Sequence, residues 1–420
     1  MPSRRRTRNR RRPTRPKSSA GFGPPSLRVG IYVCALAGVF AGVAFAAFYL
    51  NACRHSTAPK HESEVITSRN APGRRVDEQA AADHFVKAME RTGGSGIWIK
   101  RLAVRSVTVP GGDAGEVLAV PSAFGALVTV ARSEAGKEGL QARITEIPSP
   151  QHGRSVELEI LHGNEPVCRW RLHEVPQIRR AAIIIDDLGG DLSAARQLLQ
   201  LDYPLTFSIM PHLRHSAVVA EEAHRAGREV MLHLPMQPEG GSAARRSADE
   251  LEVGMTSFTV RSIIESDLAS VPHAAGVNNH MGSRATADAS LMAEVMQVFR
   301  ERHLYFVDSR TTPDTVALEV ARRMQLPAFY RSVFLDDTET TTYTLGQLRQ
   351  LRRVLEEQGT AIAIGHPYPT TLNALGQFLP ELERDDIQLL PASQLTRLPE
   401  AVRLSPTPKR PLQASNSAAP

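Results

Sequence analysis

The carboxyl-terminal half of the chain alternates short apolar runs with amphipathic stretches. The apolar runs have the length of buried parallel strands, and the stretches between them repeat apolar residues at helical spacing, with Asp191 placed to cap the first helix. Seven or eight βα units in about 220 residues predict a deformed (β/α) barrel over residues 178–398, with a doubly wound open sheet as the alternative. The expected strands are Ala181–Ile185, Leu205–Met210, Glu229–Leu232, Ala274–Val277, Leu304–Val307, Ser332–Leu335, Ala361–Ile364 and Ile387–Leu390.

A different pattern precedes the barrel. A helical stretch over Glu78–Arg91 is followed by β-prone runs that glycine and proline residues separate. Together they predict a small α+β domain over residues 78–176, to which the sequence assigns no role. The expected strands are Gly96–Val109, Glu116–Val120, Gly125–Ala131, Leu140–Ile147 and Ser155–Leu161.

One long apolar segment lies near the amino terminus. Residues 29–50 carry no charge, and this uncharged run is long enough for a transmembrane helix. The basic tail, residues 1–28, precedes it, so the positive-inside rule keeps the amino terminus in the cytoplasm. We expect a single-pass protein of the inner membrane with its folded domains in the periplasm, joined by a linker over 51–77 and ending in a disordered tail over 399–420. A cleaved signal peptide and a lipoprotein modified at Cys53 are alternatives.

The same segment contains a Gly38-x-x-x-Gly42 spacing, which permits two such helices to pack as a dimer. The three cysteines of the chain form no CxxC pair and no zinc-finger spacing, so they neither require nor exclude an oxidising compartment.

Charge and composition exclude several classes of protein. The chain is 42% hydrophobic, which excludes a wholly disordered protein. Its net charge is +6, but nine of its 50 basic residues lie within residues 4–17, which leaves 41 basic against 44 acidic residues elsewhere. The folded part is therefore slightly acidic, and nucleic acid is not expected as a partner. Binding of nucleic acid through the arginine-rich tail alone is the remaining alternative.

Polar residues with catalytic chemistry directly follow six of the expected barrel strands. The carboxyl ends of parallel strands meet at one edge of a sheet, where active sites form. A single Asp after a strand is an ordinary helix cap, but six such strand ends in succession predict a shared site. The residues are Asp186 and Asp187, His233, Asn278 to His280, Asp308 to Arg310, Asp336 and Asp337, and His366.

These residue types favour metal-assisted hydrolysis. Two imidazoles and one carboxylate with open positions for water form a hydrolytic zinc site, a second carboxylate can act as base, and a separate histidine can protonate a leaving group. The sequence has no GxGxxG, GxxxxGK[ST] or GxSxG motif, so nucleotide chemistry and a serine nucleophile of the hydrolase-elbow type are not indicated.

Six segments of the barrel resemble the motifs of the divergent polysaccharide deacetylase family, a distant relative of the NodB-type carbohydrate esterases. They are IIIDDLG, MLHLPMQP, GVNNHMGSRAT, YFVDSRTT, FLDD and AIAIGHPYPTT, in order along residues 178–398. The resemblance implies a polysaccharide-deacetylase barrel and a metal-activated water that attacks an acetamide carbonyl and releases acetate.

The resemblance also implies roles for individual residues. Asp186 matches the base and Asp187 a metal ligand, whereas the HxxxH-like segment that supplies the other ligands in NodB-type enzymes is missing. We therefore expect His233 and His280 to complete the site, with Asp308 or His366 as substitutes for His280, and His366 otherwise to act as catalytic acid. Asp308 is favoured as a carboxylate that orients a ligand histidine, and Asp336 and Asp337 as rim residues. Substrate-binding or orienting roles are expected for Asn279, Ser283, Arg284, Asp308, Ser309 and Arg310.

Two functions remain open at this point. The first is a membrane-anchored, metal-dependent hydrolase with a divalent cofactor, zinc by preference, that deacetylates peptidoglycan or another N-acetylated envelope glycan. The second is a catalytically inactive scaffold or regulator that binds glycan or protein on the same fold.

Overall fold

The computed structural model describes residues 78–101, 114–137, 139–240 and 249–398. The segments expected at 1–28, 29–50, 51–77 and 399–420 lie outside these residues. Within the described ranges, no helix combines the length and apolarity needed to cross a membrane.

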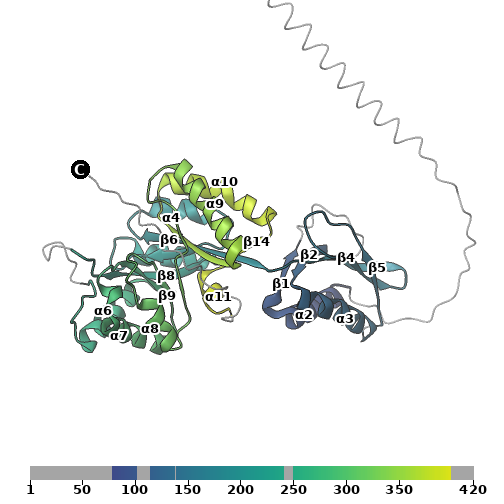
Figure 1. Cartoon of the computed structure of the whole chain (residues 1–420), viewed down its shortest axis with the longest axis horizontal. Helices are drawn as coiled ribbons and strands as arrows, with labels where there is room; N and C mark the ends of the chain where they lie inside the picture. The colour runs from purple at the N-terminus through teal and green to yellow at the C-terminus, as the bar shows by residue number, and fades with distance from the viewer. Residues whose placement is uncertain (1–77, 102–113, 138, 241–248, 399–420) are drawn as a thin grey trace, which may run out of the picture. The chain divides into compact units, whose positions relative to one another are not determined.

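The first described region is a five-stranded mixed sheet with helices packed on one face (Figure 1). The sheet has the order β1-β2-β5-β4-β3, and only β2 and β5 pair in parallel. Trp170, Phe124 and Leu127 fill the core between sheet and helices. The elements are α2 (Glu78–Gly93), η1 (Gly94–Gly96), β1 (Ile97–Arg101), β2 (Ala114–Ala119), α3 (Pro121–Lys137), β3 (Gln141–Glu146), β4 (Ser155–His162) and β5 (Glu165–Glu174).

One strand expected in this region is wrong. Residues Gly125–Ala131 belong to helix α3, not to a strand. The run is rich in β-branched residues, but Pro121 begins a helix, and Phe124, Leu127 and Ala131 are buried at helical spacing. Burial of one helical face against the sheet outweighs the weak local preference. Strand β5, which carries Trp170, was not anticipated from the pattern.

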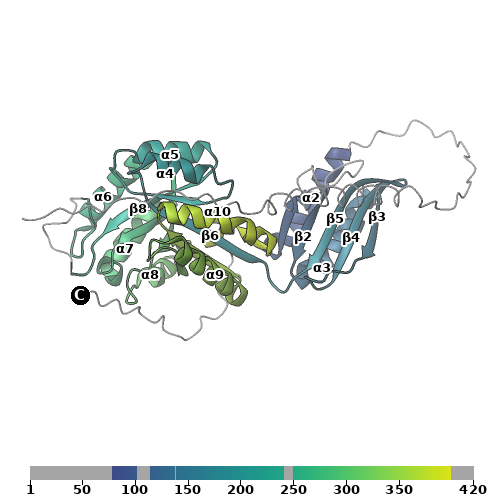
Figure 2. The same ribbon diagram turned by 90° about the horizontal axis from the view of Figure 1, so that it is seen from above.

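The second region is a curled, all-parallel sheet surrounded by helices (Figures 1 and 2). Its order is β11-β10-β9-β8-β7-β6-β13-β12, and β14 pairs with the start of β6. The strands are β6 (Arg179–Leu188), β7 (Thr206–Ile209), β8 (Glu229–Met236), β9 (Ala274–Met281), β10 (Tyr305–Asp308), β11 (Ala328–Tyr330), β12 (Val333–Phe334), β13 (Thr360–Gly365) and β14 (Ile387–Leu389). The helical elements are α4 (Leu192–Leu199), α5 (Ser216–Arg225), α6 (Ser257–Ser270), η3 (Ala285–Ala287), α7 (Ala289–Glu301), α8 (Ala317–Arg323), α9 (Thr341–Gln358), α10 (Pro369–Arg384) and α11 (Ala392–Thr396).

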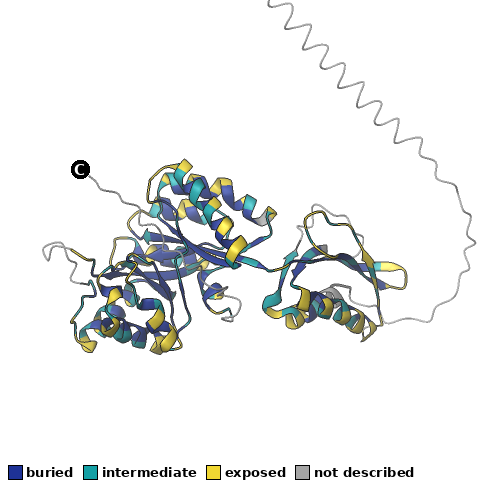
Figure 3. Cartoon of the chain, in the orientation of Figure 1, coloured by how far each residue is buried: buried dark blue, intermediate teal, exposed yellow. Residues whose placement is uncertain are grey.

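This sheet is a deformed β/α barrel, as expected, rather than a doubly wound sheet. Alternate residues of β6 belong to two different clusters: Ala181, Ile183 and Ile185 pack against the surrounding helices, whereas Ala182 and Ile184 face a smaller interior cluster. Both faces of the strands are therefore buried, which explains their uninterrupted apolar runs (Figure 3). The edge strands β11 and β12 are joined directly by two residues of the chain.

The strands extend further than their apolar runs suggest. Strands β8 and β9 remain paired beyond their apolar runs, from Leu234 opposite Asn279 to the pair that Met281 forms. His233 and Asn278 therefore lie opposite each other within the ladder. The polar residues after the apolar runs are thus held by strand hydrogen bonds, which makes their positions rigid.

Candidate metal centre

The paired aspartates lie in a β-bulge at the end of β6. Pairing with β7 is regular up to Ile185 and resumes only at Leu188, and Asp187 has a left-handed backbone with a φ of 56°. Successive side chains of a regular strand point to opposite faces, but a bulge redirects them. As a result, Asp186 and Asp187 both face His233 on β8: the nearest carboxylate oxygens lie 3.7 and 3.2 Å from its Nε2 atom.

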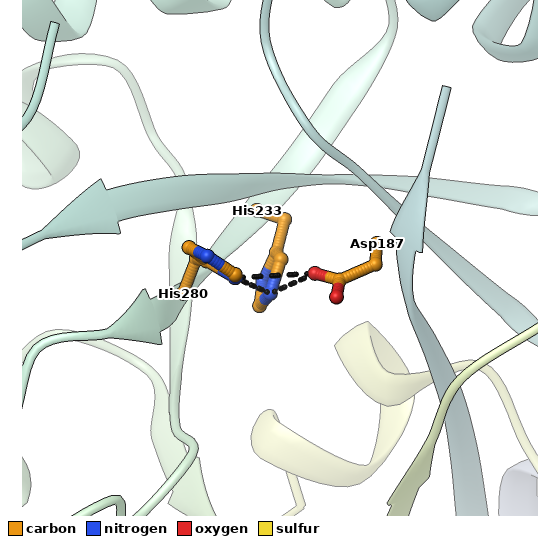
Figure 4. Close-up of side chains that lie close together, drawn as sticks. All are labelled: Asp187, His233 and His280. Carbon is orange, nitrogen blue, oxygen red and sulfur yellow. Dashed lines mark hydrogen bonds and ion pairs between the residues drawn. The ribbon is translucent and has the colours of Figure 1, made fainter. Parts of the chain in front are cut away.

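Three potential ligand atoms converge at this point (Figure 4). Asp187 Oδ1 lies 3.2 Å from His233 Nε2 and 3.1 Å from His280 Nδ1, and the two nitrogens are 3.2 Å apart. Ligands about 2.0–2.1 Å from a tetrahedral zinc ion lie about 3.3 Å from one another. The nearly equilateral triangle of two imidazole nitrogens and one carboxylate oxygen therefore fits a divalent cation. We conclude that these residues are suited to hold one.

The triangle is accessible from one side only. His233 is 3% exposed, whereas the side chains of Asp187 and His280 are 38% and 27% exposed. Asp186 and Asn278, which both contact His233, are themselves buried. A substrate can therefore approach over Asp187 and His280.

The pKa values of Asp187 and His233 reflect the closeness of these charged groups. Burial alone would raise the pKa of Asp187, but hydrogen bonds and charge from His233 and His280 lower it well below its usual range. Burial lowers the pKa of His233, yet the charges of Asp186 and Asp187 outweigh it and raise that pKa. The site thus concentrates negative charge next to two imidazoles, which suits a cation.

A fourth strand end supplies a separate histidine. His366, directly after β13, directs Nε2 towards Asp187 Oδ2 at 3.7 Å, and its Nδ1 lies 3.0 Å from Asp336 Oδ1. The other oxygen of Asp336 accepts from the His366 backbone N–H and from Thr371 Oγ1. Burial lowers the pKa of His366, but the bond to Asp336 and its charge outweigh this and raise it. Asp336, interpreted from sequence as a rim residue, therefore holds this imidazole.

Aromatic rings flank His366. Phe334 meets the imidazole edge-on at 5.5 Å between ring centroids, and Tyr368 lies tilted against it at 5.4 Å. Neither ring is among the residues predicted for the site; Phe334 is the last residue of β12, and Tyr368 lies in the loop after β13.

The other predicted site residues support the loops around the centre. Asn279 accepts from the Ser309 backbone N–H and donates to the Met281 carbonyl. Ser283 accepts from the Glu239 backbone N–H, and the backbone N–H of Arg284 donates to the Gln237 carbonyl. The structure thus gives these residues a role in loop geometry.

Asp308 differs from the expectation. Its two oxygens accept from the Arg310 backbone N–H and from Thr315 Oγ1, so it holds the loop after β10 instead of orienting a ligand histidine. The loop turns back sharply there, with a φ of 51° at Arg310, and the carboxylate stabilises that turn. Arg310 lies over the Tyr330 ring, and the buried Ser309 hydroxyl has no hydrogen-bond partner among the described residues.

Fold and site together define a parallel β/α barrel with a two-histidine, one-carboxylate cluster at the carboxyl edge of its strands. The family model of divergent polysaccharide deacetylases matches residues 183–396, and the chain belongs to that family. This confirms the resemblance drawn from the six motifs.

Known relatives support the same grouping. The chain is 35% identical over 227 residues to the uncharacterized protein YibQ of Escherichia coli K12, covering 54% of this chain and 70% of the relative. It is also 35% identical over 218 residues to an uncharacterized protein of Haemophilus influenzae, covering 52% and 77%. The crystal structure of an uncharacterized protein from Agrobacterium tumefaciens C58 has a TM-score of 0.50 at 23% identity, covering 52% and 89%. At that identity the similarity shows the shared fold.

Proposed function

We propose that the protein is a metal-dependent hydrolase that removes acetyl groups from N-acetylated glycans of the cell envelope. The observation that carries this proposal is the triangle of Asp187, His233 and His280, with Asp186 on its buried side and His366 across from it. A divalent cation bound by these three residues would lower the pKa of a water molecule and polarise the acetamide carbonyl.

The side chains divide the proton transfers between them. Asp186 Oδ2, which faces the triangle, takes a proton from the attacking water as the new C–O bond forms. His366 Nε2 gives a proton to the amide nitrogen as the C–N bond breaks. The products are acetate and a free amine. Asp336 keeps His366 oriented and stabilises its protonated form.

The direct test is acetate release by the purified, zinc-loaded protein. We expect acetate from N-acetylglucosamine oligomers or from peptidoglycan, and at least a hundredfold less from the variants Asp187→Asn and His366→Ala. If the zinc-loaded protein releases no acetate from either glycan, the hydrolase proposal fails and the non-catalytic scaffold is favoured.

The proposed location follows from the sequence. Residues 29–50 would anchor the chain in the inner membrane and place residues 78–398 in the periplasm, next to the glycan. Extraction of membranes at alkaline pH should leave the protein in the pellet, and removal of residues 29–50 should release it. Chemical cross-linking of the full chain would detect a dimer that depends on Gly38 and Gly42.

A further inference from the structure

Asn278 connects the proposed base with the proposed metal ligand. It is fully buried in β9, and its amide makes three side-chain hydrogen bonds. Its Nδ2 group donates to Asp186 Oδ1 at 2.8 Å, and its Oδ1 atom accepts from Ser208 Oγ at 2.7 Å. The same Oδ1 atom lies 2.9 Å from His233 Nδ1.

The partners determine which way the amide points. The carboxylate of Asp186 is an acceptor, so the amide nitrogen must face it, and the amide oxygen must face Ser208 and His233. An amide oxygen cannot donate, so His233 Nδ1 must carry the hydrogen of that bond. In a neutral imidazole the other nitrogen, Nε2, then presents its lone pair, and this is the atom that faces Asp187 and His280.

The same amide also distinguishes the two oxygens of Asp186. Oδ1 is occupied by the Asn278 amide, whereas Oδ2 lies 3.7 Å from His233 Nε2. Only Oδ2 is therefore directed towards the position where a reacting water would lie.

From these contacts we propose that Asn278 is a positioning residue that fixes the tautomer of His233 and selects Oδ2 of Asp186 as the base. This rests on the proposed function of the site. The asparagine amide accepts from the imidazole and donates to the carboxylate through two separate atoms, without adding charge. Leucine does neither, and aspartate accepts but does not donate. Partners of this kind orient metal-binding histidines, and their loss lowers metal affinity by about 10–100-fold.

The test compares Asn278→Leu, Asn278→Asp and Ser208→Ala in the full chain. Zinc affinity is measured by competition with a chelating dye, and the protonated ring nitrogen of His233 by nitrogen-15 NMR of the zinc-free protein at alkaline pH. We expect Asn278→Leu to weaken zinc binding about 10–100-fold and to produce a mixture of tautomers. Asn278→Asp should bind zinc at least as well as wild type but release acetate 10–100-fold more slowly, and Ser208→Ala should have a smaller effect on both.

Thr206→Val is the matched control, because it removes the two hydrogen bonds of a buried β7 hydroxyl, one to Glu229 and one from the Ala392 backbone N–H, two residues before Ser208. It should leave the His233 spectrum and zinc affinity unchanged. A folded Asn278→Leu protein with wild-type zinc affinity and a single Nδ1-protonated tautomer would overturn the proposal. If wild-type protein binds no zinc, the proposed cation site fails, whereas the spectrum of the zinc-free protein still decides the tautomer assignment.

Discussion

His233 and His366 are alike in position and differ in their partners. Both follow apolar strand runs, both direct Nε2 towards Asp187, and both place Nδ1 about one hydrogen-bond length from an oxygen. That oxygen belongs to the neutral amide of Asn278 at 2.9 Å for His233, and to the carboxylate of Asp336 at 3.0 Å for His366.

The different partners of Nδ1 suit His233 to metal binding and His366 to a role as general acid. A neutral amide oxygen fixes the orientation of the ring and favours the imidazolium less than a carboxylate would, so that Nε2 is more readily available to a cation. A carboxylate stabilises the imidazolium and so favours a proton on Nε2. The residue type and its place on the fold are the same, and the partner of the outer nitrogen distinguishes the two roles.

The largest expected effect is on metal binding. Replacing His233 by alanine removes one of three ligands, so the full chain should lose more than about a hundredfold in zinc affinity. His366→Ala should bind zinc like wild type, since Asp187, His233 and His280 stay in place. His224→Ala is the matched control, because this exposed histidine stacks on His273 and does not belong to the triangle. If His233→Ala and His366→Ala lost zinc equally, the proposed difference in metal binding between the two histidines would be wrong.

The second prediction concerns catalysis. His366→Ala should lower kcat for acetate release by about 10²–10⁴-fold, the usual contribution of a positioned general acid, while the zinc content stays at one ion per chain. Turnover assays on protein with verified metal content provide the measurement. A kcat within threefold of wild type would remove His366 from the proton transfer.

A smaller effect is expected when the partner alone is changed. Asp336→Asn gives His366 an amide partner, as His233 has, and removes the charge that raises the pKa of His366. The acid must be protonated, so activity is lost as the pH rises through this pKa. We therefore expect the alkaline limb of the kcat profile to move to lower pH, with a loss of about 10-fold near neutrality. An unmoved limb would contradict the assignment of His366 as the acid.

Another histidine–carboxylate pair shows that such a pair alone does not make a site. His212 Nε2 lies 2.9 Å from Oδ1 of the fully buried Asp267, and neither residue belongs to the triangle. Burial and the charge of Asp249 outweigh the histidine and raise the pKa of Asp267 to about 7.

This pair makes a prediction about stability. In the unfolded chain the carboxyl of Asp267 has its ordinary pKa of 3.8, so the folded state binds more protons between pH 4 and 7, and stability falls as the pH rises through that window. Asp267→Asn should remove this decline, an effect of the order of 4 kcal/mol, as measured by urea unfolding at several pH values. Parallel curves for the two proteins would show that Asp267 does not titrate in this range.

The sequence was sufficient to predict eight of the nine described barrel strands, all except β11, and to single out Asp187, His233 and His280, which lie together in the structure. Apolar runs buried on both faces, each followed by a polar residue, indicate a parallel barrel and its functional edge. What the pattern could not provide was the partner of each polar residue. The sequence places Asn278 among the polar strand-end residues without indicating its partners, which become clear only when β8 and β9 are paired. Asp336 looks like a rim residue until His366 is placed beside it.

Some errors have a different physical origin. Residues Gly125–Ala131 form a helix because tertiary burial outweighs local β preference. Asp186 and Asp187 face the same site because of the bulge and the left-handed backbone at Asp187. The alternation of side chains in a regular strand predicts neither feature. The sequence could suggest both residues as functional but not explain how two neighbours face the same site.

The most direct test of the proposed centre is the zinc content of the purified full chain, measured by mass spectrometry after zinc loading and dialysis. Asp187→Asn, His233→Ala, His280→Ala and His366→Ala are measured beside wild type. We expect one zinc ion per chain in wild type and His366→Ala, and none in the three ligand variants. No retained zinc in wild type, or retention in folded His233→Ala protein, would contradict the assignment of Asp187, His233 and His280 as the metal centre.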